Sequence, residues 1–312
     1  MTKQEQAINI EKPIAEQIAE IGVNLKLEDI DQRTVDNAKI FFLDCLGCIL
    51  SGSQVDSAKS IRAAVADIGG GGECTIIGTN YKTNPMLAAL INGTTGHSQD
   101  YDDDHREGTQ HSSVVVLPAV LALAEKYGKS GKEALLAYIF GSEVTIRAGE
   151  AFKGTSYYAG WHLTGTCGVF GSAAAAAKIM GLNVEQTVNA LAVAGSASAG
   201  LGEFNSCGAW TKRFHAGRAS MDGVLAAYMG KNNFFGPPTV FEGKEGFLAC
   251  FSFKGTPENP NPKGDYDASK LIAGFGKKWE MADNSIKLHA CCRFTNNFCD
   301  CAIDIHNQGC DV

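Results

Sequence analysis

Residues 97–111 bring together side chains that transfer protons: four aspartates and three histidines. Unpaired acids and histidines are costly to bury, so a hydrophobic core does not use them at this density. Histidine exchanges protons near neutral pH, and a neighbouring carboxylate can orient its ring. If a helix beginning at Pro85 continues this far, His97, Asp100 and Asp104 share one face. The alternative is a solvated acidic helix end, although acids near a helix C-terminus oppose the helix dipole.

Three later segments add a histidine and several cations. His162 stands before a Gly- and Thr-rich helix start, where backbone N–H groups can hold a carboxylate. Lys212 lies in a short basic run, and Lys287 and Arg293 lie close together near the end of the chain. Ammonium and guanidinium groups bind carboxylates, so these residues suit an anionic substrate. The alternatives, a structural histidine and an ordinary basic helix start, stay open.

The overall charge and the lack of familiar motifs argue against several classes of protein. The formal net charge is −7 and there is no extended run of lysine and arginine, which argues against nucleic-acid binding. Apolar stretches are interrupted before they reach membrane-spanning length. The polar N-terminus is unlike a leader peptide and the eleven cysteines show no disulfide rhythm, so we expect a cytoplasmic protein with reduced thiols. No phosphate loop, dinucleotide fingerprint, nucleophile elbow or zinc-type cysteine spacing is present.

Helical patterns dominate the chain, which predicts a mainly α fold. Apolar periodicity or helix-start signals mark residues 35–49, 84–91, 130–152, 171–178 and 183–193. Asn84 followed by Pro85 is typical of an N-cap and a first helical position. The Ser-Gly-Lys-Glu sequence at 130–133 is a capping-box pattern. The best strand signal is short, at residues 74–77, so no alternation of strands and helices is predicted.

Composition divides the chain into two unequal parts. Residues 254–267 contain three prolines and two glycines, which interrupt regular structure. We therefore predict a helical domain over residues 1–253, a linker at 254–267 and the start of a second domain at 268–312. About 45 residues are too few for a comfortable independent domain. Because an amphipathic pattern still runs at the last residues, we expect the chain to be cut short at its C-terminus.

Six segments together resemble the MmgE/PrpD family, which includes 2-methylcitrate dehydratase, cis-aconitate decarboxylase and iminodisuccinate epimerase. They follow the family's order along nearly the whole chain: residues 44–48, 92–104, 111–113, 168–181, 212–217 and 287–295. The resemblance implies a large all-helical domain followed by a smaller α+β lid domain, with the active site in the cleft between them. It also implies a homodimer that needs no metal or organic cofactor. Family members are typically much longer, so only the beginning of the lid is expected here.

The resemblance also assigns roles to residues of this chain. The catalytic residues that it implies are Asp100, Asp104, His111 and His162, and the substrate-binding residues are Lys212, Lys287 and Arg293. Such a set suits a lyase for a small polycarboxylate, because acids and bases move protons while cations hold the carboxylates. Two positions depart from the family: Asn296 replaces a histidine, and the decarboxylase has threonine where Asp104 stands.

We expect dehydration of the 2-methylcitrate type, with decarboxylation or epimerisation of related acids as the alternatives within the family. An alternative of another class is a metal-dependent all-α enzyme, because carboxylate-rich sites bind divalent cations. No second aspartate-rich segment appears downstream, which weighs against it. The last alternative is an inactive, truncated homologue. Because proton transfer needs precise placement under a water-excluding lid, we expect weak or no turnover from this chain alone.

Overall fold

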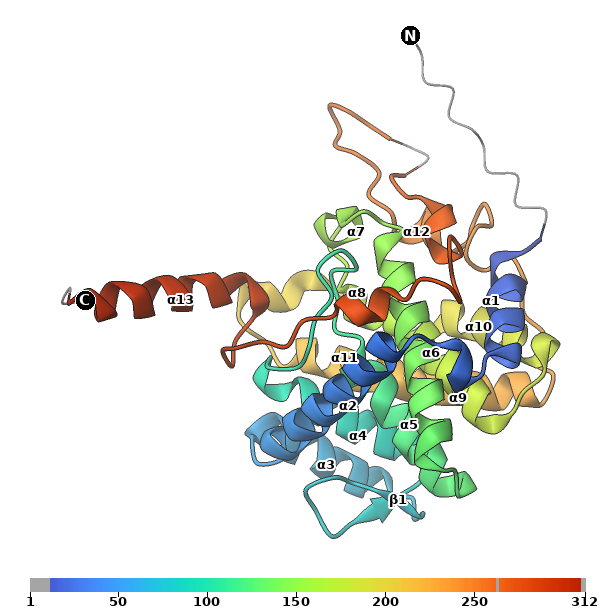
Figure 1. Ribbon diagram of the computed structural model, residues 1–312, viewed down its shortest axis with the longest axis horizontal. Coiled ribbons are helices and arrows are strands. Elements are labelled where there is room, and N and C mark those ends of the chain that lie inside the picture. The colour runs from blue at the N-terminus through green and yellow to red at the C-terminus, as the bar shows by residue number, and fades with distance from the viewer. Residues whose placement is uncertain (1–11, 262–263, 310–312) are drawn as a thin grey trace.

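Helices make up most of the structure, which confirms the predicted mainly α fold (Figure 1). The computed structural model describes residues 12–261 and 264–309. Within these ranges the two strands, β1 (Cys74–Thr75) and β2 (Lys82–Thr83), form one small antiparallel pair. The sheet is therefore a minor part of a helical body, and the helices must position the site.

The helices are joined by connections of very different length, and among the described residues the longest α-helix-free stretch lies between α12 and α13. The α-helices are α1 (Ile14–Asn24), α2 (Gln32–Gly52), α3 (Asp56–Ile68), α4 (Pro85–Gly96), α5 (Ser113–Tyr127), α6 (Gly131–Glu150), α7 (Thr155–Tyr158), α8 (Leu163–Thr166), α9 (Gly168–Met180), α10 (Val184–Ala197), α11 (Thr211–Lys231), α12 (Phe247–Phe251) and α13 (Arg293–Asn307). Short 3-10 helices are η1 (Leu27–Asp29), η2 (His97–Gln99), η3 (Gly202–Ser206), η4 (Ala268–Leu271) and η5 (Glu280–Asp283).

Side-chain caps begin several helices where the sequence predicts them. The Asn84 side chain accepts a hydrogen bond from a first-turn N–H of α4. Ser130 and Glu133 form the predicted capping box at α6, and Asn183 and Gln186 form another at α10. The first turn of a helix leaves its N–H groups without helical partners, and these side chains satisfy them. Local sequence therefore sets where these helices begin.

Two glycines allow α4 and α11 to pack unusually closely. Gly93 of α4 faces Gly217 of α11, and a Cβ atom added at Gly93 would lie 2.7 Å from the Gly217 Cα. No side chain fits in that space, so glycine is required for this approach. The packing brings the end of α4 beside the start of α11. Lys212, in the first turn of α11, consequently contacts Asp100, which lies just beyond α4.

Residues 268–284 pack against α6. Phe275 and other apolar side chains of this segment belong to the main hydrophobic core together with the helices. The buried Arg147 guanidinium pairs with Glu143 at 2.6 Å and donates hydrogen bonds to three backbone carbonyls of the segment. A buried ion pair needs such additional partners to offset its desolvation. The division of the chain at residues 254–267 stays a prediction.

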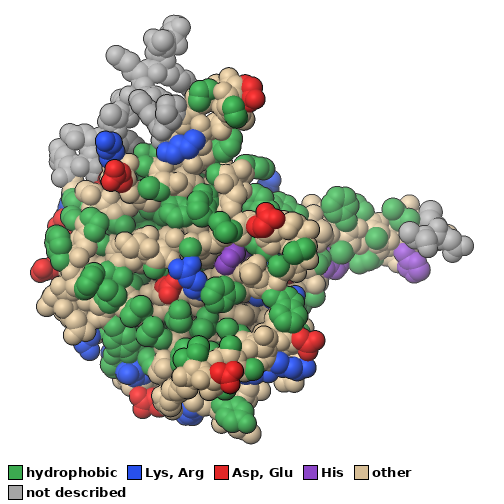
Figure 2. Space-filling view, turned by 180° about the vertical axis from the view of Figure 1, so that it is seen from behind, with side chains coloured by type: hydrophobic (Ala, Val, Ile, Leu, Met, Phe, Trp, Pro, Cys, Tyr) green, Lys and Arg blue, Asp and Glu red, His purple; other side chains and the backbone are tan. Residues whose placement is uncertain are grey.

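α13 differs from the other long helices because none of its residues is buried. It projects away from the helical body in Figure 1, with apolar side chains along its length in Figure 2. On the face that Figure 2 shows, acidic and basic side chains are interspersed and no extended basic patch is visible.

Among residues 12–261 and 264–309, no single helix is both long enough and apolar enough to cross a membrane. α2 and α3 meet that length and composition only as a pair, and the pair is bent by 82°.

Candidate active site

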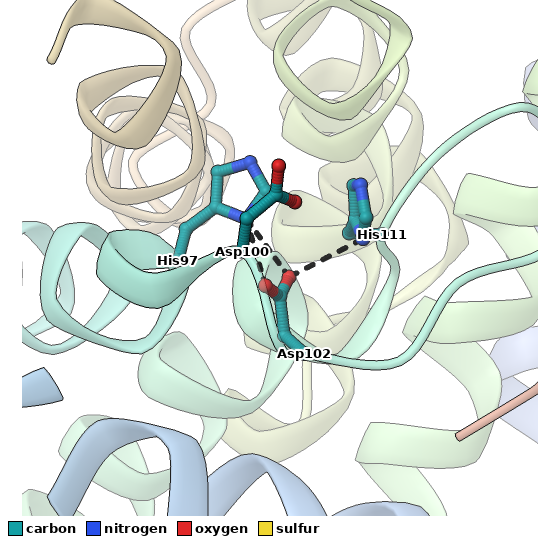
Figure 3. Close-up of side chains that lie close together, drawn as sticks. All are labelled: His97, Asp100, Asp102 and His111. Carbon is teal, nitrogen blue, oxygen red and sulfur yellow. Dashed lines mark hydrogen bonds and ion pairs between the residues drawn. The ribbon is translucent and has the colours of Figure 1, made fainter. Parts of the chain in front are cut away.

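Four parts of the chain meet beyond the C-terminal end of α4. They are residues 97–111, His162 before α8, the first turns of α11 and residues 284–293. Figure 3 shows the centre of this cluster, where the side chains of four residues from the first segment are turned toward one another. Segments far apart in the sequence thus supply one group of acids, histidines and cations.

α4 ends at Gly96, so the expected continuation of this helix to Asp104 is wrong. The 3-10 turn η2 follows, and Asp100 then adopts a left-handed backbone conformation with φ 54° and ψ 34°. Few residue types adopt this conformation, although aspartate and asparagine do so more readily than most. After this reversal of direction, residues 102–104 lie in buried positions while Asp100 remains partly exposed.

The Asp100 carboxylate lies between two lysines. Lys212 Nζ donates a hydrogen bond to Oδ2, and Lys287 Nζ lies 3.0 Å from Oδ1 and 2.6 Å from the backbone oxygen. Burial alone would raise the pKa of Asp100, but the neighbouring histidines and both lysines hold it well below its usual range. The Lys287 side chain is only 2% exposed. Burial alone would lower its pKa, yet the nearby carboxylates outweigh burial and raise it.

Three histidines with lowered pKa values, His111, His162 and His215, lie beside this charged group. The rings of His111 and His162 contact that of His97, with centroids 4.7 and 5.9 Å away. His111 Nδ1 donates to the Asp103 backbone carbonyl at 2.9 Å, and His162 and His215 share a hydrogen bond between their Nδ1 atoms at 3.0 Å. Burial is the main cause that lowers the pKa of His111 to about 3, that of His215 to about 4 and that of His162 well below its ordinary value. These three rings therefore carry no charge at neutral pH.

Asp102 and Asp103 are both completely buried, but they favour different protonation states. Both oxygens of Asp102 lie 2.9 Å from His97 Nδ1. Burial opposes ionisation of Asp102, yet the adjacent histidines hold its pKa below the usual range. Asp103 Oδ2 accepts hydrogen bonds from Ser113 at 2.7 Å and from Asn284 at 2.5 Å. Burial raises the pKa of Asp103 well above its ordinary value, so this residue favours its neutral form.

Asp104 connects the site to the C-terminal segment. Arg293 Nη1 donates to Asp104 Oδ1 at 2.6 Å, and the backbones of Asp104 and Ser285 exchange two hydrogen bonds of 3.0 and 2.9 Å. Burial raises the pKa of Asp104, although Arg293 opposes this shift. With the Lys287 contact to Asp100, the structure brings all seven predicted site residues into one region. Their catalytic and binding roles stay predictions.

The structure also adds residues to which the sequence patterns give no separate role. The added residues are His97, Asp102, His215 and Asn284, each hydrogen-bonded within the cluster. The first three lie in the same polar segments as the predicted residues, and this proximity in the sequence is the feature that could have identified them. Asn284 belongs to no motif, and only the fold reveals its contact with Asp103. The helix start expected to hold a carboxylate after His162 is a single turn, α8, with four residues.

One group of side chains has the composition of a metal site. His97, Asp100, Asp102 and His111 each offer a ligand atom within 4.8 Å of the others. The Asp100 carboxylate, however, is already paired with two ammonium groups, and Asp102 is paired with the His97 ring. A divalent cation bound there would have to displace both lysines, because the like charges of the cation and the ammonium groups repel one another. The surrounding charges therefore suit an anionic ligand better than a cation.

Comparison with known proteins extends over most of the chain. The family model described as the MmgE/PrpD N-terminal domain matches residues 16–259. A cis-aconitate decarboxylase of Aspergillus terreus is 31% identical over 299 residues, which is 94% of this chain and 60% of that protein. A cis-aconitate decarboxylase-like protein of Aspergillus oryzae is 32% identical over 86% of this chain and 56% of its own length.

A more distant relative has a different activity in its name. A probable 2-methylcitrate dehydratase of Saccharomyces cerevisiae is 27% identical over 75% of this chain and 48% of that protein. Across these three relatives, the chain spans about half to 60% of their length.

Proposed function

The chain belongs to the MmgE/PrpD family, and on this premise we propose that it is a lyase acting on a small polycarboxylate. The observation that carries the proposal is the convergence of Lys212 and Lys287 on one carboxylate, that of Asp100. Two ammonium groups held this close can also receive the carboxylates of a substrate. Beside them, uncharged His111 and His162 are available to exchange protons.

Decarboxylation is the reaction we favour, because the relatives named for it are 31% and 32% identical to the chain, against 27% for the dehydratase. In this reaction the bond between a carboxylate carbon and its neighbour breaks, CO2 leaves, and the electron pair stays on the neighbouring carbon. That carbon then takes up a proton from the site. Lys212 and Lys287 would hold the remaining carboxylates and stabilise the negative charge as it develops.

Dehydration, the reaction expected from the sequence, is the second candidate, and Asp104 supports it. A proton is removed from a carbon beside a carboxylate, the C–OH bond breaks, and the hydroxyl leaves as water after protonation. Asp104 has a pKa raised by burial, which suits a group that donates the proton to the leaving hydroxyl. His111 lies in the same region and would accept the proton from carbon.

Product analysis distinguishes the two reactions. We expect incubation with cis-aconitate, citrate and 2-methylcitrate, followed by mass spectrometry, to show loss of CO2 from the first acid or loss of water from the hydroxy acids. Lys212→Met should reduce turnover at least tenfold, because a cation that stabilises developing charge is removed. Lys59→Met is the matched control, since Lys59 lies exposed on α3, where it pairs with Asp56 at 3.2 Å.

Two outcomes would contradict the proposal. One is a folded chain that neither binds nor converts any of these acids. The other is turnover that a chelator abolishes and one particular divalent metal restores, which would favour the metal-dependent alternative.

A further inference from the structure

Asp102 is a buried carboxylate whose hydrogen-bonding partner is a single histidine ring. Its side chain is fully inaccessible, and both of its oxygens lie 2.9 Å from His97 Nδ1. Among residues 12–261 and 264–309, the other donor at this carboxylate is His111 Nδ1, which lies farther away, at 3.4 Å from Oδ2. A buried carboxylate without a donor is strongly unfavourable, so His97 must present an N–H at Nδ1.

The same carboxylate also lies close to a second ring. Asp102 Oδ2 is 3.4 Å from His111 Nδ1, and that nitrogen donates to the Asp103 backbone carbonyl at 2.9 Å. A carbonyl oxygen can only accept, so the proton of the neutral His111 ring is on Nδ1. The negative charge of Asp102 therefore faces the Nδ1 side of both His97 and His111, as Figure 3 shows.

The His97 ring packs against two other histidine rings of the site. Its centroid lies 4.7 Å from that of His111, and its plane is within 18° of that of His162 at 5.9 Å. The His97 side chain is fully buried, and its Nε2 atom has no hydrogen-bond partner in the described parts of the chain. A ring enclosed in this way acts on substrate through its neighbours and does not touch it.

These contacts deepen the proposed function and rest on it. We propose that Asp102 and His97 are positioning residues of the active site: Asp102 holds the Nδ1 proton of His97, and its charge faces the Nδ1–H that His111 donates to the Asp103 carbonyl. Nε2 of His111 is then the atom that exchanges a proton with the substrate. The arrangement follows the logic by which a buried aspartate sets the tautomer of a catalytic histidine. Here one carboxylate serves two rings, and the His97 ring keeps that of His111 in place.

The charges around His111 agree with this arrangement. Burial and Lys287 lower the pKa of His111, and Asp102 is the neighbour that opposes them. His97 and Lys212 also lower this pKa, and Asp100 and His162 are further titratable groups that interact with this ring. Removing the Asp102 charge should therefore make His111 a weaker base, since less negative charge supports the protonated ring.

The tautomers can be measured without any turnover. Selective 15N labelling of histidine in the intact chain reports which ring nitrogen carries the proton. We expect Nδ1–H signals for His97 and His111, and loss of the His97 assignment to Nδ1–H in Asp102→Asn. A His97 ring protonated on Nε2 and not on Nδ1 would overturn the proposal, whether or not the chain converts any acid.

Turnover supplies the second test. Asp102→Asn should lower kcat at least tenfold with little change in KM, because substrate carboxylates still meet both lysines. His97→Asn keeps a donor toward Asp102 and should retain more kcat than His97→Leu. A purely structural role predicts lower thermal stability in these variants with kcat per folded molecule unchanged, and that result would also overturn the proposal.

The matched control is a buried histidine of the same segment. His105 is 2% exposed, and its Nδ1 accepts a hydrogen bond from the Gly108 N–H at 3.0 Å without contacting Asp102. His105→Gln should therefore leave kcat and the His97 tautomer as they are. If the parent chain neither binds nor converts any of the acids, the proposed function fails, while the tautomer measurement still decides the arrangement around Asp102.

Discussion

Asp100 combines a rare backbone conformation with two cationic partners. Asparagine also tolerates the left-handed region, so Asp100→Asn removes the charge without adding backbone strain. We expect the free energy of unfolding to fall by about 3 kcal/mol, because Lys287 becomes a buried ammonium group without its carboxylate. Urea unfolding followed by circular dichroism measures this change. An unchanged midpoint would show that the Asp100 backbone oxygen, which Lys287 also contacts, is a sufficient partner.

The coupling between Lys287 and Asp100 can be measured separately. Lys287→Met should also destabilise the fold, because it leaves the partly buried Asp100 with Lys212 alone. The double variant should lose less than the sum of the two single losses, by about 1 to 3 kcal/mol, since residues in direct contact are not independent. Strictly additive losses would mean that the ion pair contributes little to stability.

The neutral histidines make stability depend on pH. The pKa of His111 is about 3 in the folded state, while an unfolded histidine titrates near its ordinary value of about 6.5. Between these values the unfolded chain binds the extra proton, so stability falls as pH falls, by up to about 1.4 kcal/mol per pH unit for one histidine. Urea unfolding between pH 7 and about 4.5 should therefore show a smaller slope for His111→Gln than for the parent chain.

Comparing the two proteins at each pH isolates the contribution of His111. Asp103 acts in the opposite direction, because its folded pKa is raised and its stabilisation is lost as pH increases. That contribution is present in both chains and cancels in the difference. Equal slopes would show that His111 is not held neutral by the fold.

At the level of elements, the contact between α4 and α11 sets the distance between Asp100 and Lys212. Gly93→Ala should destabilise the fold by about 2 kcal/mol, because a Cβ there meets the Gly217 backbone at 2.7 Å and the two helices must separate. Turnover should fall more than stability suggests, since Lys212 moves with α11. Thermal unfolding and kcat measured on the same preparation check both effects.

Gly47 in α2 is the matched control. A Cβ added at Gly47 meets nothing within 4 Å, and its backbone is helical. Gly47→Ala should therefore stabilise the chain by about 0.5 to 1 kcal/mol, because alanine restricts the unfolded chain and favours the helix. A similar loss of stability in both variants would indicate that the close contact at Gly93 is not the cause.

These elements also show how far the sequence could predict the molecule. Caps such as Asn84 and the Ser130 capping box were readable because they depend on residues three positions apart. The end of α4 at Gly96 was not, because the left-handed turn at Asp100 is stabilised by lysines that lie over a hundred residues away. Distant residues also decide which of the four aspartates are ionised and which favour the neutral form, so their spacing alone could not predict these states.

At the level of the whole molecule, the site depends on the packing of residues 268–293 against the helical body. Arg147 and Glu143 fasten the first part of this stretch to α6. Asn284 and Arg293 then reach Asp103 and Asp104, as described above. Such non-local contacts form only when the whole chain is folded, so the lysine pair and the histidines should lose their arrangement together in a cooperative transition.

α13 leaves an apolar face largely exposed, although the Phe294 ring at its start lies 6.3 Å from that of Tyr157, centroid to centroid. Phe294, Phe298, Cys301 and Ile305 recur at three- and four-residue spacing and so share one side of the helix. Phe294 and Phe298 are 67% and 73% exposed, and an isolated helix of this length is marginal in water. A second copy of the chain is the partner we propose, as in the homodimer that the family resemblance implies, and the α13 faces of two copies would bury each other.

Phe298→Ser should then weaken self-association at least tenfold, measured by sedimentation at several concentrations, because a large apolar side chain leaves the interface. The melting temperature of the parent chain should rise with concentration, and that dependence should shrink in the variant, since association stabilises only the folded form. Asn307→Ser, on the opposite side of α13, should change neither measurement. Equal association of Phe298→Ser and the parent chain would show that α13 does not mediate self-association. A monomeric parent chain with full turnover would show instead that the site needs neither a second copy nor a cover over this helix.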